Sequence, residues 1–102
     1  MSNNDEQDKL LNLPFSMVIE DVFVIQRKGI AIIGRVQTGC ARKGDEILIV
    51  GKDMSIPTRI VSFEGFIRDP DAYVAWAGDN VAILIGDVDR DAIEAGMIVV
   101  SV

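Results

Sequence analysis

Short runs of β-branched and aliphatic residues, separated by turns that contain glycine, dominate this sequence and limit the folds open to it. The connections hold the residues that tight turns favour, as in Gln26-Arg27-Lys28-Gly29 and Ala77-Gly78-Asp79. This pattern is typical of an all-β sandwich or barrel. A chain of 102 residues can bury one hydrophobic core but not two. We therefore predict a polar tail over residues 1–13, followed by one small closed antiparallel barrel of about six strands over residues 14–102.

The expected strands begin and end at these turns. Gly34 interrupts the second strand, where a bulge or bend would let the barrel curve. Residues 68–76 are expected to be irregular, and Asp91-Ala92-Ile93-Glu94 indicates a capping box on one short helical turn. The six predicted strands are Phe15–Ile25, Ile30–Thr38, Glu46–Val50, Pro57–Phe66, Asn80–Ile85 and Met97–Val102.

Residue usage excludes several classes of function. The chain has no histidine, which removes the commonest general base and metal ligand. Its one cysteine, Cys40, cannot form an intrachain disulfide and suits a reducing compartment. The N-terminus lacks a signal-peptide pattern, and apolar stretches such as Val22–Ile25 are too short to cross a bilayer. We expect a soluble cytoplasmic protein that is not an enzyme, with no cofactor and no membrane partner.

An apparent metal-binding motif fails on inspection. Asp87-Val88-Asp89-Arg90-Asp91 alternates acidic residues as a calcium loop does. Ala92 stands where that loop needs glycine, and Ile98 where it needs a bidentate glutamate. We therefore assign these carboxylates to turns and a helix cap, and expect no metal.

Charge is spread unevenly. The net charge is −6, which argues against non-specific nucleic-acid binding. Yet eight of the ten Lys and Arg residues fall within residues 26–68. They form either a basic face or a set of solvated strand and turn charges, and the pattern favours the solvated charges.

Two segments are apolar on both faces of their strands. In Val22–Ile25 and Ile30–Ile33 the alternation expected of a barrel strand with a wet outer face is absent. Part of the outer surface is therefore expected to be covered. The cover would be the Leu10–Leu13 segment folding back, or a partner.

Glu64 is a candidate binding residue because it sits on an apolar strand between Phe63 and Gly65. Its carboxylate would accept hydrogen bonds from a ligand in a shallow apolar pocket. Alternatively it points outward and pairs with Arg59 or Arg68, which the pattern alone favours.

Seven segments, read in order, resemble the second domain of elongation factor Tu and other translation GTPases. The resemblance covers residues 14–102 and is nearly collinear. The segments are Pro14-Phe15, Ile19-Glu20-Asp21-Val22-Phe23, Gly34-Arg35-Val36, Lys43-Gly44-Asp45-Glu46, Ile49-Val50-Gly51, Ala77-Gly78-Asp79-Asn80-Val81 and Ile93-Glu94-Ala95-Gly96-Met97-Ile98-Val99.

The resemblance implies a β-barrel of the kind that follows a GTPase domain and helps hold the aminoacylated 3′ end of tRNA. Phe23 and Ile25 match the apolar wall of the family's pocket, and Glu64 matches the glutamate that contacts the terminal adenosine. Ile67 stands where the family has arginine, although Arg68 is adjacent, and Ile33 stands where it has threonine. No GTP binding is expected, since no phosphate loop or guanine-specificity motif occurs.

Two functional hypotheses follow. In the favoured one, the chain is a module that docks on a protein partner or on a second copy, through its outer apolar strands or the Tyr73–Trp76 loop. In the alternative, it binds a tRNA end or another nucleotide-like ligand in the Phe23, Ile25 and Glu64 pocket. Arg35 and Arg68 would then contact phosphates, and Tyr73 or Trp76 would stack on a base.

Overall fold

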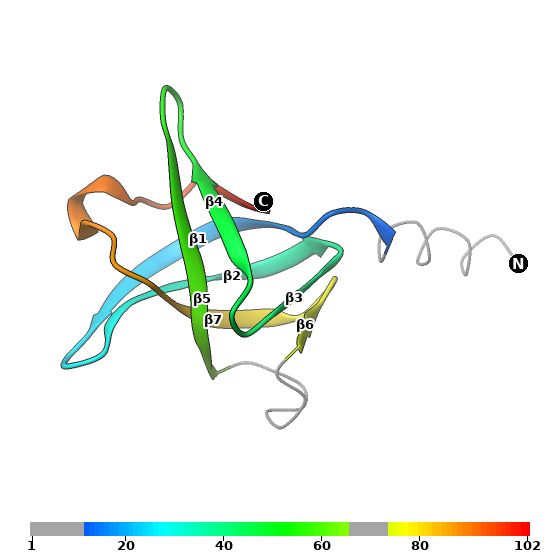
Figure 1. Ribbon diagram of the computed structural model, residues 1–102, viewed down its shortest axis with the longest axis horizontal. Helices are drawn as coiled ribbons and strands as arrows, with labels where there is room; N and C mark the ends of the chain where they lie inside the picture. Colours follow the sequence, from blue (N-terminus) through cyan, green and yellow to red (C-terminus); the bar gives the residue numbers. More distant parts are fainter. Residues whose placement is uncertain (1–11, 66–73) are drawn as a thin grey trace, which may run out of the picture.

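Six strands close into an antiparallel barrel in the order β1-β2-β7-β5-β4-β8 (Figure 1). The computed structural model describes residues 12–65 and 74–102. The predicted small closed barrel is confirmed. Its strands are β1 (Ser16–Ile25), β2 (Gly29–Thr38), β4 (Glu46–Val50), β5 (Ser55–Gly65), β7 (Asn80–Ile85) and β8 (Ile98–Ser101), beside a two-stranded sheet of β3 (Cys40–Arg42) and β6 (Val74–Trp76) and one 3₁₀ turn, η1 (Arg90–Ala92).

Alternating side chains fill the barrel interior. Residues two apart on a strand point to the same face, so every second aliphatic residue enters the core. In β7, for example, Val81, Ile83 and Ile85 belong to the core. The largest of the almost completely buried side chains are Met17, Ile19, Ile32, Val36, Ile47, Ile49, Ile60, Val81, Ile83, Ile93 and Val99.

Gly34 marks the place where β1 and β2 approach most closely, but the bulge lies in β1. The register between the two strands shifts between Ile19 and Asp21, opposite Gly34. A β-carbon on Gly34 would collide with the carbonyl oxygen of Val18. The glycine therefore permits a close backbone approach beside the bulge, rather than forming the bulge itself.

β3 and β6 pair with each other, which contradicts the predicted irregular chain at 74–76. Cys40 lies opposite Trp76, and Arg42 opposite Val74. Each strand has three residues, too short for a periodic pattern, and its partner lies more than thirty positions away. The remainder of the predicted irregular stretch, including Arg68 and Tyr73, lies outside the described residues, as do Leu10 and Leu11.

Two local predictions need correction. The cap of the helical turn is Asp89, whose carboxylate accepts a hydrogen bond from the Asp91 amide. The turn therefore begins before the predicted capping box at Asp91.

The position of Pro57 also differs from the prediction. Pro57 lies inside β5 rather than at its start, opposite Leu48 of β4. Since β5 pairs with β7 only from Ile60 onward, the missing proline N–H costs no hydrogen bond on that side.

Candidate functional site

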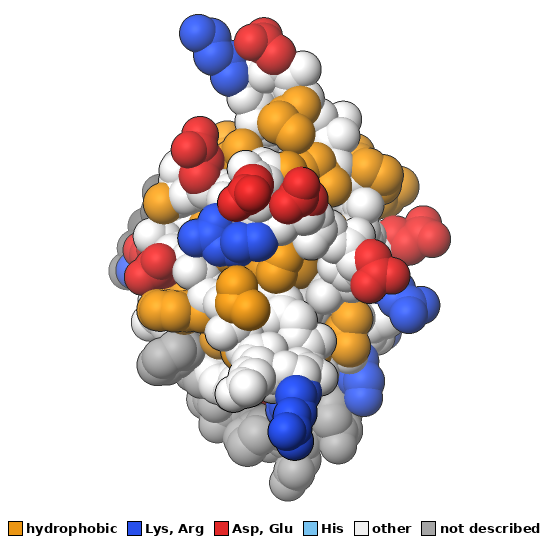
Figure 2. All heavy atoms as spheres, turned by 90° about the vertical axis from the view of Figure 1, so that its left-hand side faces the viewer, with side chains coloured by type: hydrophobic (Ala, Val, Ile, Leu, Met, Phe, Trp, Pro, Cys, Tyr) orange, Lys and Arg blue, Asp and Glu red, His pale blue; other side chains and the backbone are white. Residues whose placement is uncertain are grey.

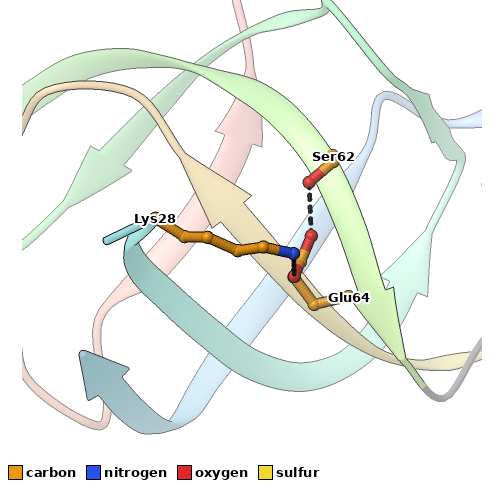
Figure 3. Close-up of polar contacts among 3 residues, drawn as sticks. All are labelled: Lys28, Ser62 and Glu64. Atoms are coloured by element: carbon orange, nitrogen blue, oxygen red, sulfur yellow. Dashed lines mark hydrogen bonds and ion pairs between the residues drawn. The ribbon is translucent and has the colours of Figure 1, made fainter. Parts of the chain in front are cut away.

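Glu64 is held on the outer surface by two side chains from different parts of the chain. Lys28 Nζ lies 2.9 Å from Glu64 Oε1, and Ser62 Oγ donates to Glu64 Oε2 over 2.5 Å. Figure 3 shows Lys28 extended from the turn after β1 toward β5, with Ser62 on the other side of the carboxylate. Glu64 therefore forms an ion pair with Lys28 and not with Arg59, while Arg68, the other predicted partner, lies outside the described residues.

These contacts keep Glu64 ionised. The hydrogen bond from Ser62, followed by the hydrogen bond and the positive charge of Lys28, lowers the pKa of Glu64 below its ordinary value of 4.5, while burial opposes the shift. An ionised carboxylate accepts hydrogen bonds and donates none. At neutral pH, Glu64 is therefore an anionic acceptor rather than a proton donor.

A row of four outward-facing side chains, three of them apolar, lies beside this carboxylate and crosses four strands. Phe23 lies opposite Ala31, Ala31 opposite Leu84, and Leu84 opposite Ser62. Ala31 and Leu84 are only 2% and 6% exposed, yet neither belongs to the core cluster. Their neighbours Ile32, Ile83 and Ile85 point inward, so both residues lie on the outer face.

Phe23 completes this surface with a ring that is 50% exposed. We call Phe23, Ala31, Leu84, Ser62 and Glu64 the Glu64 face. It combines a covered aliphatic floor, a half-exposed aromatic ring and an ionised acceptor. The exposed ring can bind the apolar surface of a ligand and the carboxylate can orient one hydrogen-bond donor, while the buried Ala31 and Leu84 support them from below.

The structure brings some of the predicted pocket residues together and separates others. Phe23 and Glu64 share one outer face, and Ile25 follows Phe23 on the same strand, opposite Gly29. Arg35 is exposed on β2 four residues beyond Ala31, opposite Asn80. Trp76 is 42% exposed on the two-stranded sheet. Arg35 and Trp76 are therefore not elements of the Glu64 face.

The sequence did not predict that Lys28, Ser62, Ala31 and Leu84 lie beside Glu64. A signal for Leu84 was present, because all five residues from Val81 to Ile85 are apolar and a strand with one wet face would alternate. No comparable signal identified Lys28 as the partner of Glu64. Their contact depends on how the β1–β2 hairpin lies relative to β5.

A second apolar surface covers the outside of β1, β8 and β4. In one row Val18 lies opposite Ile98, and Ile98 opposite Val50. These side chains are 38%, 44% and 36% exposed. The adjacent row runs from Val100 through Leu48 to Pro57. We call these six residues the outer patch, and none of them is charged.

A shallow groove of about 600 Å³ continues from the outer patch along β5. Leu48 and Pro57 belong to both surfaces, and Arg59, Gly86 and Asp87 lie further along the groove. The hydroxyl of Thr58, which also lines it, is buried and has no hydrogen-bond partner among residues 12–65 and 74–102. The groove extends the outer patch toward charged side chains.

The segment around η1 is acidic. Asp87, Asp89, Asp91 and Glu94 are all exposed, with Arg90 among them. Figure 2 shows acidic side chains gathered around basic ones on this face.

The described residues form neither a metal site nor a membrane-spanning helix. Within residues 12–65 and 74–102, no cluster of three or more carboxylate or cysteine side chains is arranged to hold a metal ion. In the same part of the chain, no helix has the length and apolarity needed to cross a membrane.

No model of a known protein family matches this chain.

Proposed function

We propose that this chain is a non-catalytic binding module, built on a barrel of the translation-GTPase type, that docks on another protein through the outer patch. The observation that carries the proposal is the run of three exposed aliphatic side chains, Val18, Ile98 and Val50, in one row across three strands. Scattered surface aliphatics are ordinary, but contiguous apolar surfaces mark interaction sites.

The neighbouring residues support docking. Val100, Leu48 and Pro57 widen the row into a surface two residues deep, with no charge to desolvate on binding. An uncharged apolar centre with a polar rim is the usual anatomy of a protein interface. Small ligands, by contrast, favour concave sites, and the outer patch is a strand surface.

Photo-crosslinking in the cells that make the protein tests this proposal. A photoreactive phenylalanine analogue in place of Ile98 is expected to yield a discrete protein adduct on illumination. The matched control carries the analogue in place of Val24, which is more exposed at 64% but lies outside the outer patch. Equal adducts from both positions, or none from position 98, would rule out docking through this surface.

The Glu64 face supports a second candidate function, the binding of a tRNA 3′ end or another nucleotide-like ligand. Phe23 offers a half-exposed ring for stacking, and Glu64 offers an ionised acceptor beside an aliphatic floor. Lys28 already occupies one carboxylate oxygen, so a ligand hydroxyl would share or displace that contact.

Titration with aminoacylated and uncharged tRNA, at low and moderate salt, tests the second candidate. Saturable binding is expected to weaken about tenfold in Glu64→Gln, which removes a charged acceptor worth about 1.5 kcal/mol. Glu46→Gln makes the same change on another part of the barrel and is expected to bind as the wild type does. Absence of saturable binding at both salt concentrations would reject this function.

A further inference from the structure

At one end of the outer patch, on β4 and β5, the border carries charges of both signs. Two residue pairs beyond Leu48 and Pro57, Glu46 lies opposite Arg59 on the same face of β4 and β5. Both side chains are exposed. Neither forms an ion pair or a side-chain hydrogen bond with any residue in the described part of the chain.

We infer that the outer patch binds a second copy of this chain in a two-fold symmetric dimer. The inference rests on the proposed docking function and names its partner. A two-fold interface places the same surface on both sides, so each residue must suit what lies opposite it in the partner. Glu46 and Arg59 meet that requirement, because the carboxylate of each copy can face the guanidinium of the other.

The strand geometry fixes how the copies would face each other. A two-fold axis running along the strands, between β4 and β5, places Glu46 of one copy opposite Arg59 of the other, and Arg59 opposite Glu46. The same operation places Leu48 opposite Pro57 of the second copy. Outer faces packed this way keep their strands roughly aligned, as two sheets do in a sandwich.

The contact can also extend beyond the residues that lie next to the two-fold axis. A stable interface buries about 800 Å² on each partner. The outer patch supplies Val50, Ile98 and Val100 on one side of the axis, and the groove along β5 continues on the other. Since the axis lies between β4 and β5, β8 of one copy faces this groove in the other.

The net charge of −6 opposes self-association. Part of the opposing charge lies in the η1 segment, where Asp87 lines the groove and the exposed Asp89, Asp91 and Glu94 do not. Salt at about 0.15 M screens exposed charges beyond about 8 Å. The uncharged patch and the two Glu46–Arg59 contacts therefore determine the interaction at physiological salt.

Sedimentation equilibrium of the purified chain tests the inference. The expected result is a mass twice the 11.1 kDa of one chain, with dissociation on dilution. Val50→Glu puts a charge into the apolar centre and is expected to weaken dimerisation at least tenfold. Val24→Glu makes the same change at an exposed site outside the outer patch, and is expected to leave dimerisation unchanged.

A charge exchange separates this arrangement from other dimers. Glu46→Arg alone and Arg59→Glu alone each place like charges opposite one another and are expected to weaken the dimer. The double variant restores opposite charges across the axis and is expected to restore the dimer. Circular dichroism at a concentration where all variants are monomeric verifies that each one folds.

A chain that stays monomeric at the highest attainable concentration would overturn the inference, and so would a dimer that ignores both Val50→Glu and the single charge reversals. The crosslinking experiment distinguishes the two failures. A monomeric chain with a position-98 adduct to a different protein refutes the second copy and keeps the docking function. Absence of any adduct from position 98 refutes both.

Discussion

Glu64 shows how three side chains set the charge of one surface position. Its pKa is lowered in the folded state by Ser62 first and Lys28 second. A carboxyl with a depressed pKa stabilises the fold above its unfolded pKa, and this contribution is lost as the pH falls through the folded value. The stabilisation is therefore complete at neutral pH, begins to be lost below about 4.5, the ordinary value, and is gone once the pH has fallen through the lower folded value.

We predict that Glu64→Gln lowers the free energy of unfolding by about 1 kcal/mol at pH 7 and by less at pH 3, where the carboxylate is more fully protonated. The magnitude stays small because Lys28 is largely exposed to solvent. Urea denaturation of both proteins at the two pH values measures the difference. Lys28→Met is expected to reproduce part of the loss at pH 7. An equal loss at pH 3 would mean that the ionised carboxylate is not the source of the effect.

Gly34 is a position at which the fold cannot accept a side chain, and Gly39 is another. We predict that Gly34→Ala destabilises the protein by about 2–3 kcal/mol, because the new methyl would push β1 away from β2 at the Val18 carbonyl. Gly65→Ala is the matched control on β5, where an added β-carbon meets nothing within 4 Å. Urea denaturation compares the two. Similar losses in both variants would show that the cost reflects glycine replacement in a strand, not the contact with Val18.

At the scale of elements, two equivalent turns hold the small β3–β6 sheet. Each has glycine at positive φ in its third position and aspartate in its fourth, in Arg42-Lys43-Gly44-Asp45 and Trp76-Ala77-Gly78-Asp79. In each, the aspartate amide donates to the carbonyl of the first residue, while its carboxylate accepts from the amide of that residue. This is the geometry of a type II turn closed by an additional side-chain bond.

The second turn joins the small sheet to the barrel. Asp79 is buried, its carbonyl accepts from Val36 in β2, and its carboxylate accepts from the Trp76 amide over 3.0 Å. We predict that Asp79→Ala costs about 1–2 kcal/mol by leaving that partly buried amide unpaired. Asp79→Asn keeps an acceptor oxygen and is expected to cost less.

Hydrogen exchange at the Trp76 amide gives the local measurement. Exchange is expected to accelerate strongly in Asp79→Ala and weakly in Asp79→Asn. Unchanged exchange in Asp79→Ala would show that the carboxylate does not hold β6 in place.

Strands with strong patterns were predictable, and strands defined by remote pairing were not. Glu46–Val50 and Asn80–Ile85 match β4 and β7 at both ends, because a turn glycine or aspartate bounds each run. β6 was missed because its three residues become a strand only by pairing with β3. The cap at Asp89 was missed because a second aspartate two positions later fitted the capping-box pattern.

At the scale of the whole molecule, barrel closure explains which features of the site could be predicted from the sequence and which could not. The apolar character of Phe23 and the isolated carboxylate of Glu64 were readable from their immediate neighbours. Their placement on one outer face was not, since it depends on pairing through β2 and β7. The outer patch likewise exists only because β8 lies between β1 and β4, which joins residues from opposite ends of the chain.

The same closure predicts slow folding. Ser16 at the start of β1 pairs with Val100 in β8, so the last seam forms only when the two ends of the chain meet. Folds dominated by such remote pairing refold on the order of milliseconds to seconds, because the entropy of loop closure is lost before the stabilising contacts form. The single tryptophan, Trp76, lies on β6 and reports formation of the small sheet by stopped-flow fluorescence. Circular dichroism reports the barrel strands. We expect both signals to change together in one exponential phase, because β6 is anchored through Asp79 to β2 of the closed barrel.

Two outcomes would contradict this prediction. Refolding within microseconds would contradict a rate limit set by closure. A tryptophan phase that clearly precedes the circular dichroism phase would show that the small sheet forms without the barrel.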